Sequence, residues 1–241
     1  MPFRVRRSLI TGLLIRPGLE FFIKYPLAAA ADLSIILPAL FSIGYKTKSV
    51  ALRYFAIYLW WTLIRNVVSI STASEQINNL LLFNVDLLIR FTLLLAMFYH
   101  TFQYPREKRT VLILLIGFWL LFGIDFFLSN PNLGDLYNHR LNLYSFVIES
   151  VLMLGLVLRF FLYLVRELPV ANLTQYPMFW ICCGLLIAHA GTVFLTPFMH
   201  YFNVWNNPYD FKTMVKIEHW VEIIRNISFA IAMAYARRST Y

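Results

Sequence analysis

The chain has 241 residues, of which 60% are hydrophobic and 14% are charged, and its mean hydropathy is +0.65. This composition is too apolar for a soluble domain of that length and predicts an all-α, polytopic transmembrane helix bundle. The net charge of +9 does not predict a nucleic-acid partner, because most Lys and Arg residues lie in short segments between apolar stretches, where positive charge sets membrane orientation. The lipid bilayer is therefore the expected surrounding of most of the chain.

Residues 1–24 start with basic residues, and their short apolar stretch is interrupted by Arg16, Pro17 and Glu20. We expect a basic amphipathic helix that lies on the membrane surface. An eighth membrane segment is the alternative. A secretory signal is not expected, because no small-residue cleavage site follows cleanly. Residues 25–241 are expected to form one seven-helix transmembrane domain.

Seven stretches have the length and apolar character of membrane spans, for which roughly 20 residues are needed. They are residues 25–44, 49–71, 78–100, 110–128, 142–164, 177–200 and 215–236. The connections between them are short, which is typical of antiparallel neighbours in a bundle.

Positive charge gathers in alternate connections and predicts the orientation of the bundle. The basic residues of one set are Lys46, Lys48, Arg106, Lys108, Arg109, Arg166, Arg237 and Arg238. The opposite connections are rich in Asn, Asp and Pro. The C-terminus is therefore expected in the cytoplasm. The basic residues of 1–24 conflict with this orientation unless residues 8–24 form a membrane segment.

Ionisable and amide side chains lie inside these apolar stretches, where each is costly in contact with lipid. Their spacing places several of them on one face of each helix, as with Asp86 and Arg90. Under the predicted orientation they lie at the middle or in the outer half of the bundle. We expect a polar cavity there, lined by the candidate ligand-binding residues Asp32, Arg65, Asn66, Asp86, Arg90, Asp125, Glu149, His189, Glu222 and Arg225.

Two interpretations of these charges stay open. They can be structural ion pairs, since Asp86 can pair with Arg90 along its helix and Glu222 with Arg225 or Arg65. They can also form a ligand or proton site, because five deep carboxylates face three arginines. At least two acids then lack a base and must be protonated, hydrated or bound to a ligand.

No motif predicts catalysis, a metal or a cofactor. The five histidines form no H-E-x-x-H pattern, and the last span has no lysine in its core for a retinal Schiff base. Cys182 and Cys183 are expected to pack as small apolar side chains. We therefore expect no enzyme activity.

Two blocks of the sequence carry a resemblance, NLLLFNVDLLIRFTLLLAMFYHTF at 79–102 and IESVLMLGLVLRFFLYLVRELPVANLTQYPMFWICCGLLIAHAGTVFL at 148–195. They resemble a family of small, uncharacterised bacterial integral membrane proteins with about seven helices. The matching features are Asn84, Phe98–Tyr99, Glu149–Ser150, Leu168–Pro169 and Pro177–Phe179–Trp180. Arg90 departs from the family pattern, in which an acid is expected nearby. The resemblance implies a bacterial inner-membrane protein and brings no established activity.

Three functions are compatible with this pattern. The first is a sensor or receptor-like module that binds a ligand or a proton in the outer cavity and relays the change to a cytoplasmic or membrane signalling partner. The second is a structural or accessory subunit of a larger membrane complex. The third is a small-solute or proton transporter, against which the lack of a visible inverted repeat counts.

Overall fold

The computed structural model describes residues 23, 25–44, 49–74, 78–131, 139–167, 172–204 and 208–238, with side chains except at 73–74, 199–204 and 208–211. These residues are helical apart from short connections. The elements are α2 (Pro26–Ser34), α3 (Ile36–Ser42), α4 (Val50–Ser74), α5 (Leu80–Thr101), α6 (Pro105–Ser129), α7 (Leu143–Glu167), the 3₁₀ turn η1 (Leu173–Gln175), α8 (Pro177–Val204) and α9 (Pro208–Arg238).

The helices follow the predicted stretches closely. α2 and α3 share one stretch, 25–44, and each of the other six stretches coincides with one helix from α4 to α9. The all-α prediction is therefore confirmed for the described residues. The predicted amphipathic helix at 1–24 lies outside the described residues, apart from Ile23.

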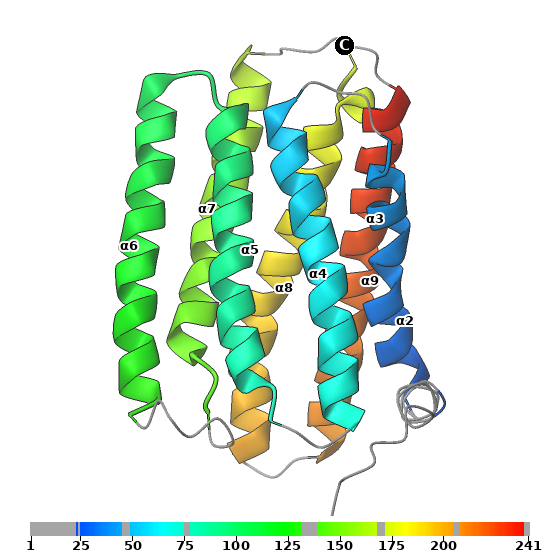
Figure 1. Cartoon of the computed structure of the whole chain (residues 1–241), viewed down its shortest axis with the longest axis vertical. Helices are drawn as coiled ribbons and strands as arrows, with labels where there is room; N and C mark the ends of the chain where they lie inside the picture. The colour runs from blue at the N-terminus through cyan, green and yellow to red at the C-terminus, as the bar shows by residue number, and fades with distance from the viewer. Residues whose placement is uncertain are drawn as a thin grey trace, which may run out of the picture.

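The helices pack as a ring in which chain order is also spatial order. Each helix from α3 to α9 contacts the next one along the chain, and α9 closes the ring by packing against α2 and α3. Helix directions alternate, so the connection at 102–104 and the end of α9 lie at the same end of the bundle (Figure 1). α6 and the α2–α3 pair lie at opposite edges in this view. This ring brings α4, α5, α7 and α9 around a common interior.

Proline sets both the starts of helices and one interruption. α2, α6, α8 and α9 each begin at a proline, whose missing N–H group is not needed in the first turn. Pro38 has the opposite effect inside 26–42, because it cannot donate to the carbonyl four residues earlier, and the helix is interrupted at Ile35. α3 then ends before Gly44, whose φ of 76° is the left-handed conformation usual just after a helix end.

Four helices are long and apolar enough to cross a membrane, namely α5, α6, α7 and the Pro177–Phe198 part of α8. This makes the chain a multi-pass membrane protein in contact with the lipid bilayer. α6 has the most lipid-facing character of the four, with 17% of its apolar window buried against 39% in α5 and α7. Its outward side chains include Ile116, Leu120 and Leu128.

The end of the bundle predicted to be cytoplasmic carries polar contacts between helices. Arg159 of α7 binds Glu107 in the first turn of α6, with one N–H···O distance of 2.7 Å. Tyr104, in the α5–α6 connection, donates to Glu167 at 3.0 Å. That carboxylate raises the pKa of Tyr104, because the hydrogen bond requires the protonated phenol.

The closest helix approach joins α8 to α9. A Cβ added at Gly184 would lie 2.8 Å from the ring of Phe229 and 3.1 Å from the carbonyl oxygen of Arg225. One added at Gly191 would lie 3.1 Å from Val221. Small residues at this spacing allow close backbone contact between membrane helices.

Gly184→Ala should therefore destabilise the protein, by about 1–3 kcal/mol, because the added methyl group overpacks the α8–α9 contact. Gly155→Ala on α7 is the matched control. A Cβ there meets nothing within 4 Å, and alanine favours the helix, so this variant should be as stable as the parent or more so. Unfolding of the purified protein in detergent measures both changes. Equal stability of the two variants would contradict the packing role of Gly184.

Candidate functional site

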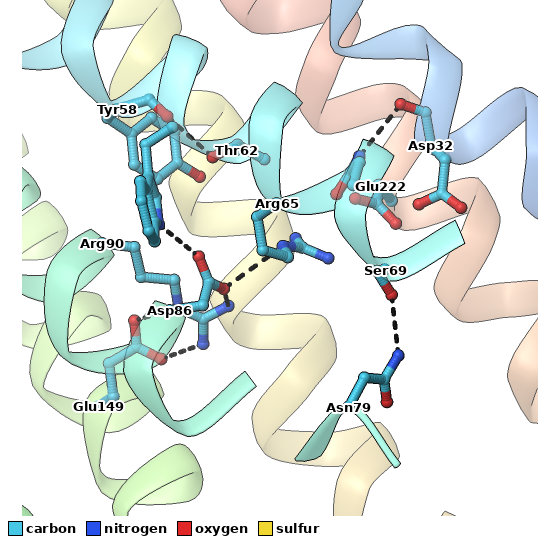
Figure 2. A network of polar contacts seen from close by, with 12 residues as sticks. Asp32, Tyr58, Thr62, Arg65, Ser69, Asn79, Asp86, Arg90, Glu149 and Glu222 are labelled. Atoms are coloured by element: carbon cyan, nitrogen blue, oxygen red, sulfur yellow. Dashed lines mark hydrogen bonds and ion pairs between the residues drawn. The ribbon is translucent and has the colours of Figure 1, made fainter. Parts of the chain in front are cut away.

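Four charged side chains from three helices meet in the interior, and we call them the central network: Arg65 of α4, Asp86 and Arg90 of α5, and Glu149 of α7 (Figure 2). Arg90 holds Glu149 by two hydrogen bonds, from Nε to Oε1 at 3.0 Å and from an Nη to Oε2 at 2.5 Å. The Glu149 side chain has no exposed surface. This bidentate geometry is the strongest form of arginine–carboxylate contact, and it ties α5 to α7.

Asp86 is shared between two arginines. Its Oδ1 accepts a hydrogen bond of 2.8 Å from the indole nitrogen of Trp61 on α4. Its Oδ2 lies 3.5 Å from Nε of Arg65 and 3.9 Å from a guanidinium nitrogen of Arg90. Within the described part of the chain, the buried Arg65 Nε makes no hydrogen bond, so Arg65 is attracted to Asp86 by charge, and its guanidinium group also lies 5.4 Å from the centre of the Phe83 ring.

A second group of charges lies on the other side of Arg65, between α2 and α9. Figure 2 shows the carboxylates of Asp32 and Glu222 beside each other, with the Arg65 side chain extending toward them. Both carboxylates interact electrostatically with Arg65 and Arg225. Glu222 is also hydrogen-bonded by Arg225 at 2.8 Å, one turn along α9. We call Asp32 and Glu222 the acid pair.

Two buried amide side chains fix α2 beside this pair. Asn66 of α4 donates to the backbone oxygen of Asp32 at 3.1 Å, and Asn226 of α9 donates to Oγ of Ser34 at 2.7 Å. Both acceptors lie in the last turn of α2, where carbonyls lack partners within the helix. The interruption caused by Pro38 is thus accommodated by side chains of the neighbouring helices.

His189 of α8 lies next to the central network. Its Nδ1 is 3.3 Å from Oγ of Ser150, the residue that follows Glu149, and the ring interacts electrostatically with Arg90 and Arg225. His189 is 8% exposed. A histidine held among arginines and a hydroxyl group is a candidate hydrogen-bond partner for a ligand rather than a metal ligand. Within the described residues, no three His, Cys, Asp or Glu side chains form a metal-binding group.

Asp125 has a different role from the other acids. Its Oδ2 accepts from both the backbone N–H and the hydroxyl of Ser145, at 2.9 and 2.6 Å, and its Oδ1 accepts from Ser129 at 3.3 Å. Ser145 is in the first turn of α7, so a carboxylate from α6 caps the start of that helix. The sequence placed Asp125 in the cavity. The structure gives it no ion pair with the central network.

Amide side chains of Asn84 and Asn130 bind the backbone just before α7. Asn84 of α5 donates to the carbonyl of Arg140 at 2.9 Å and accepts from the backbone N–H of Asn142 at 3.0 Å. Asn130 accepts from the backbone N–H of Arg140 at 2.7 Å and lies 3.2 Å from Nδ1 of His139. These contacts hold the chain just before α7 against α5 and α6.

The central network lies about a third to a half of the way along α5 and α7. Asp86 and Glu149 are each the seventh residue of their helix, about 9 Å from its start at 1.5 Å per residue. Arg90 is one turn further, close to the middle of a hydrocarbon layer about 30 Å thick. The fully buried Phe98 and Phe160 fill the interior toward the opposite ends of these helices. Charged side chains and packed aromatic rings therefore lie at different distances along α5 and α7.

Two hollows lie elsewhere. One, of about 550 Å³, is lined by α6 and α7 side chains that include Leu120, Leu128 and Tyr144. The other, of about 400 Å³, follows the outer face of α4 and includes Ile57 and Trp60. Neither of these two hollows is lined by a member of the central network, and of the predicted cavity residues only Asp125 lines one of them, so the outer polar chamber stays a prediction.

The structure therefore joins nine of the ten predicted residues in one connected region and sets Asp125 apart. Sequence reasoning missed Trp61 and Asn226. Trp61 precedes Arg65 by one turn, so its position on the polar face of α4 was the available signal. Asn226 directly follows Arg225, and its contact with α2 could not be inferred from α9 alone.

No family model matches this chain, and neither curated proteins nor solved structures gave a match. The resemblance to bacterial seven-helix membrane proteins therefore stays a prediction, and the multi-helix architecture with four candidate spans is what the structure supports.

Replacing Arg90 by leucine should destabilise the protein by about 3–5 kcal/mol, because buried Glu149 then loses its base. The double variant Arg90→Leu/Glu149→Leu should recover much of that loss, since no uncompensated charge remains. Unfolding of both variants in detergent or in mixed micelles measures the difference. If the second substitution lowered the stability of Arg90→Leu further instead of restoring it, the two residues would not act as a pair.

Asp125→Ala should weaken the first turn of α7 and lower stability by about 0.5–2 kcal/mol, as for the loss of a helix cap. Ser129→Ala is the control, because it removes only the 3.3 Å contact to the same carboxylate. Hydrogen exchange should accelerate at residues 143–146 in Asp125→Ala and stay close to the parent in Ser129→Ala. Unchanged exchange in both would contradict the capping role.

Proposed function

We propose that this protein is a membrane sensor or receptor-like module that receives a proton or a small ligand in the outer half of the bundle and relays the change to a cytoplasmic or membrane partner. The observation that carries the proposal is the position of Arg65. It lies between Asp86 of the central network and the acid pair, and it makes no hydrogen bond through Nε to the nearer carboxylate. A cation between two anionic groups can move from one to the other, and such a change of partner is the rearrangement that a switch requires.

Seven spans are part of this proposal. The four candidate spans are joined in the ring by α4, α9 and the interrupted α2–α3 helix, whose interior faces carry the partners of the central network and the acid pair. The α2–α3 helix is shorter than the four candidate spans, and α4 and α9 have a lower mean hydropathy or more charged residues. With the basic connections in the cytoplasm, the proposed location is a bacterial inner membrane with a cytoplasmic C-terminus.

An aromatic contact chain supports relay to the cytoplasmic half. The Arg225 guanidinium lies 5.9 Å from the centre of the Phe229 ring, which packs edge-on against Phe55 at 5.0 Å and Tyr58 at 6.2 Å. These rings join α9 to α4 in the interior. A change in the position of Arg225 would therefore alter the packing of α4 against α9. The connections at this end are too short to contain an output domain, so the relay requires a partner.

One observation favours the alternative of an accessory subunit. α6 contacts chiefly α5 and α7, and large side chains on its outward face, including Ile113 and Trp119, are exposed. A neighbouring subunit could cover that face, and the charges would then be structural pairs. In that case removal of a charge changes stability but not helix positions.

Electron–electron distance measurements separate these two functions. Spin labels at Arg109 of α6 and Arg237 of α9, both exposed, report the separation of two helices at the predicted cytoplasmic end, after Cys182 and Cys183 are replaced by alanine. Asp86→Asn releases Arg65 toward the acid pair, so the distance distribution should shift or change its populations.

Asp125→Asn is the matched control, because it removes one buried carboxylate outside the central network. Its distance distribution should match that of the parent. If Asp86→Asn folds and also gives the parent distribution, the network is structural and the accessory role is favoured.

A further inference from the structure

The interior charges do not balance. The central network and the acid pair, with Arg225, contain four carboxylates and three guanidinium groups. Glu149 is held by Arg90, Glu222 by Arg225, and Asp86 lies beside Arg65. The remaining carboxylate is Asp32. An ionised carboxylate without a base is costly inside a membrane protein.

Asp32 also lacks donors. Among the described residues, its carboxylate accepts no hydrogen bond and forms no ion pair, although its backbone oxygen accepts from Asn66. The charged groups that face it from the packed helices are Glu222 and Arg225 of α9 and Arg65 of α4. Arg225 is already hydrogen-bonded to Glu222, and Arg65 is paired with Asp86.

A buried amide next to Asp32 provides an independent observation. Asn66 is 2% exposed, and its Oδ1 is a buried acceptor without a partner in the described part of the chain. The oxygen and nitrogen of an amide are fixed next to each other, so this oxygen lies close to the Nδ2 that binds the backbone oxygen of Asp32. A buried, unsatisfied acceptor calls for a donor. A neutral carboxyl group supplies one O–H donor, whereas a carboxylate only accepts.

We propose that Asp32 is the proton-binding residue of this protein and that it exchanges one proton in the presence of Glu222. When the proton is bound, Asp32 offers an O–H donor in a region of acceptor oxygens, and Arg65 stays with Asp86. When the proton leaves, the extra negative charge beside Glu222 attracts Arg65 away from Asp86. His219 and Glu218 also face Glu222 from α9 and modulate the same charge. This inference rests on the proposed sensor function and names its input as a proton.

Labelling with dicyclohexylcarbodiimide tests the proposal, because this apolar reagent reacts with protonated carboxyl groups in membrane proteins. The full-length protein in detergent or liposomes is labelled across mildly acidic to mildly alkaline pH, and the modified residues are identified by mass spectrometry. Asp32 should be labelled at neutral pH, and labelling should fall as pH rises. Glu149 and Asp125, which are paired or multiply hydrogen-bonded, should stay at least tenfold less labelled and serve as internal controls.

Variants sharpen the result. Asp32→Asn should abolish the label, and Asp32→Glu should restore it. Glu222→Gln should retain the label at Asp32 and lower the pH of half-maximal labelling, because a neighbouring negative charge is removed. An unlabelled Asp32 over the whole pH range would overturn the proposal, and the wild-type measurement alone can show this if a variant does not fold.

Two further outcomes are decisive. Protection of Asp32 by sodium at constant pH would overturn the proton assignment in favour of a cation site. Labelling of Asp32 that is independent of pH would show a permanently neutral residue and would equally overturn it. In Asp86→Asn, Arg65 loses its partner and Glu222 still attracts it whether or not Asp32 carries a proton, so failure of this inference and failure of the sensor function are distinguishable.

Discussion

Charge inside hydrocarbon needs a partner, and the contact between Arg90 and Glu149 meets that requirement most completely in this protein. Glu149 has no exposed surface, and both of its oxygens accept from one guanidinium group. In water such a pair would add little to stability, but inside a membrane the loss of either partner leaves an isolated charge. The relative position of α5 and α7 is therefore fixed by this pair, and the rest of the polar interior is arranged around it.

The other polar groups divide into those that hold the helices and those left incompletely satisfied. Asp125, Asn84 and Asn130 bind backbone groups at the start of α7 and have an evident structural role. Among the described residues, the Nε of Arg65 and the carboxylate of Asp32 make no hydrogen bond, and both side chains lie on the α2–α9 side of α4. A polar network whose groups are incompletely hydrogen-bonded on one side breaks few contacts when it rearranges, and this property is the physical basis of the proposed switch.

Much of the fold could be predicted from local sequence. Apolar stretches of membrane length located the helices, although α6 and α9 begin at Pro105 and Pro208, earlier than the expected residues 110 and 215. The same spacing rules placed Asp86, Arg90 and Glu149 on interior faces. The predicted contact between Asp86 and Arg90 along their helix is present at 3.9 Å, but Arg90 binds Glu149 of the facing helix more closely, which the spacing within one helix did not predict. Spacing within one helix identifies only partners one turn apart. In the packed bundle, the long arginine side chain also reaches a carboxylate on the facing helix.

The sequence alone determined that the chain is helical, that most of it is too apolar for water, and which residues would have to avoid lipid, because these depend on composition and helical period. Only the tertiary structure decided which charge meets which. Asp125 became a helix cap, Trp61 became a partner of Asp86, and Asp32 was left without a base. The reason is that ion pairs depend on the rotation and depth of two helices relative to each other, and neither quantity is encoded within a single helix.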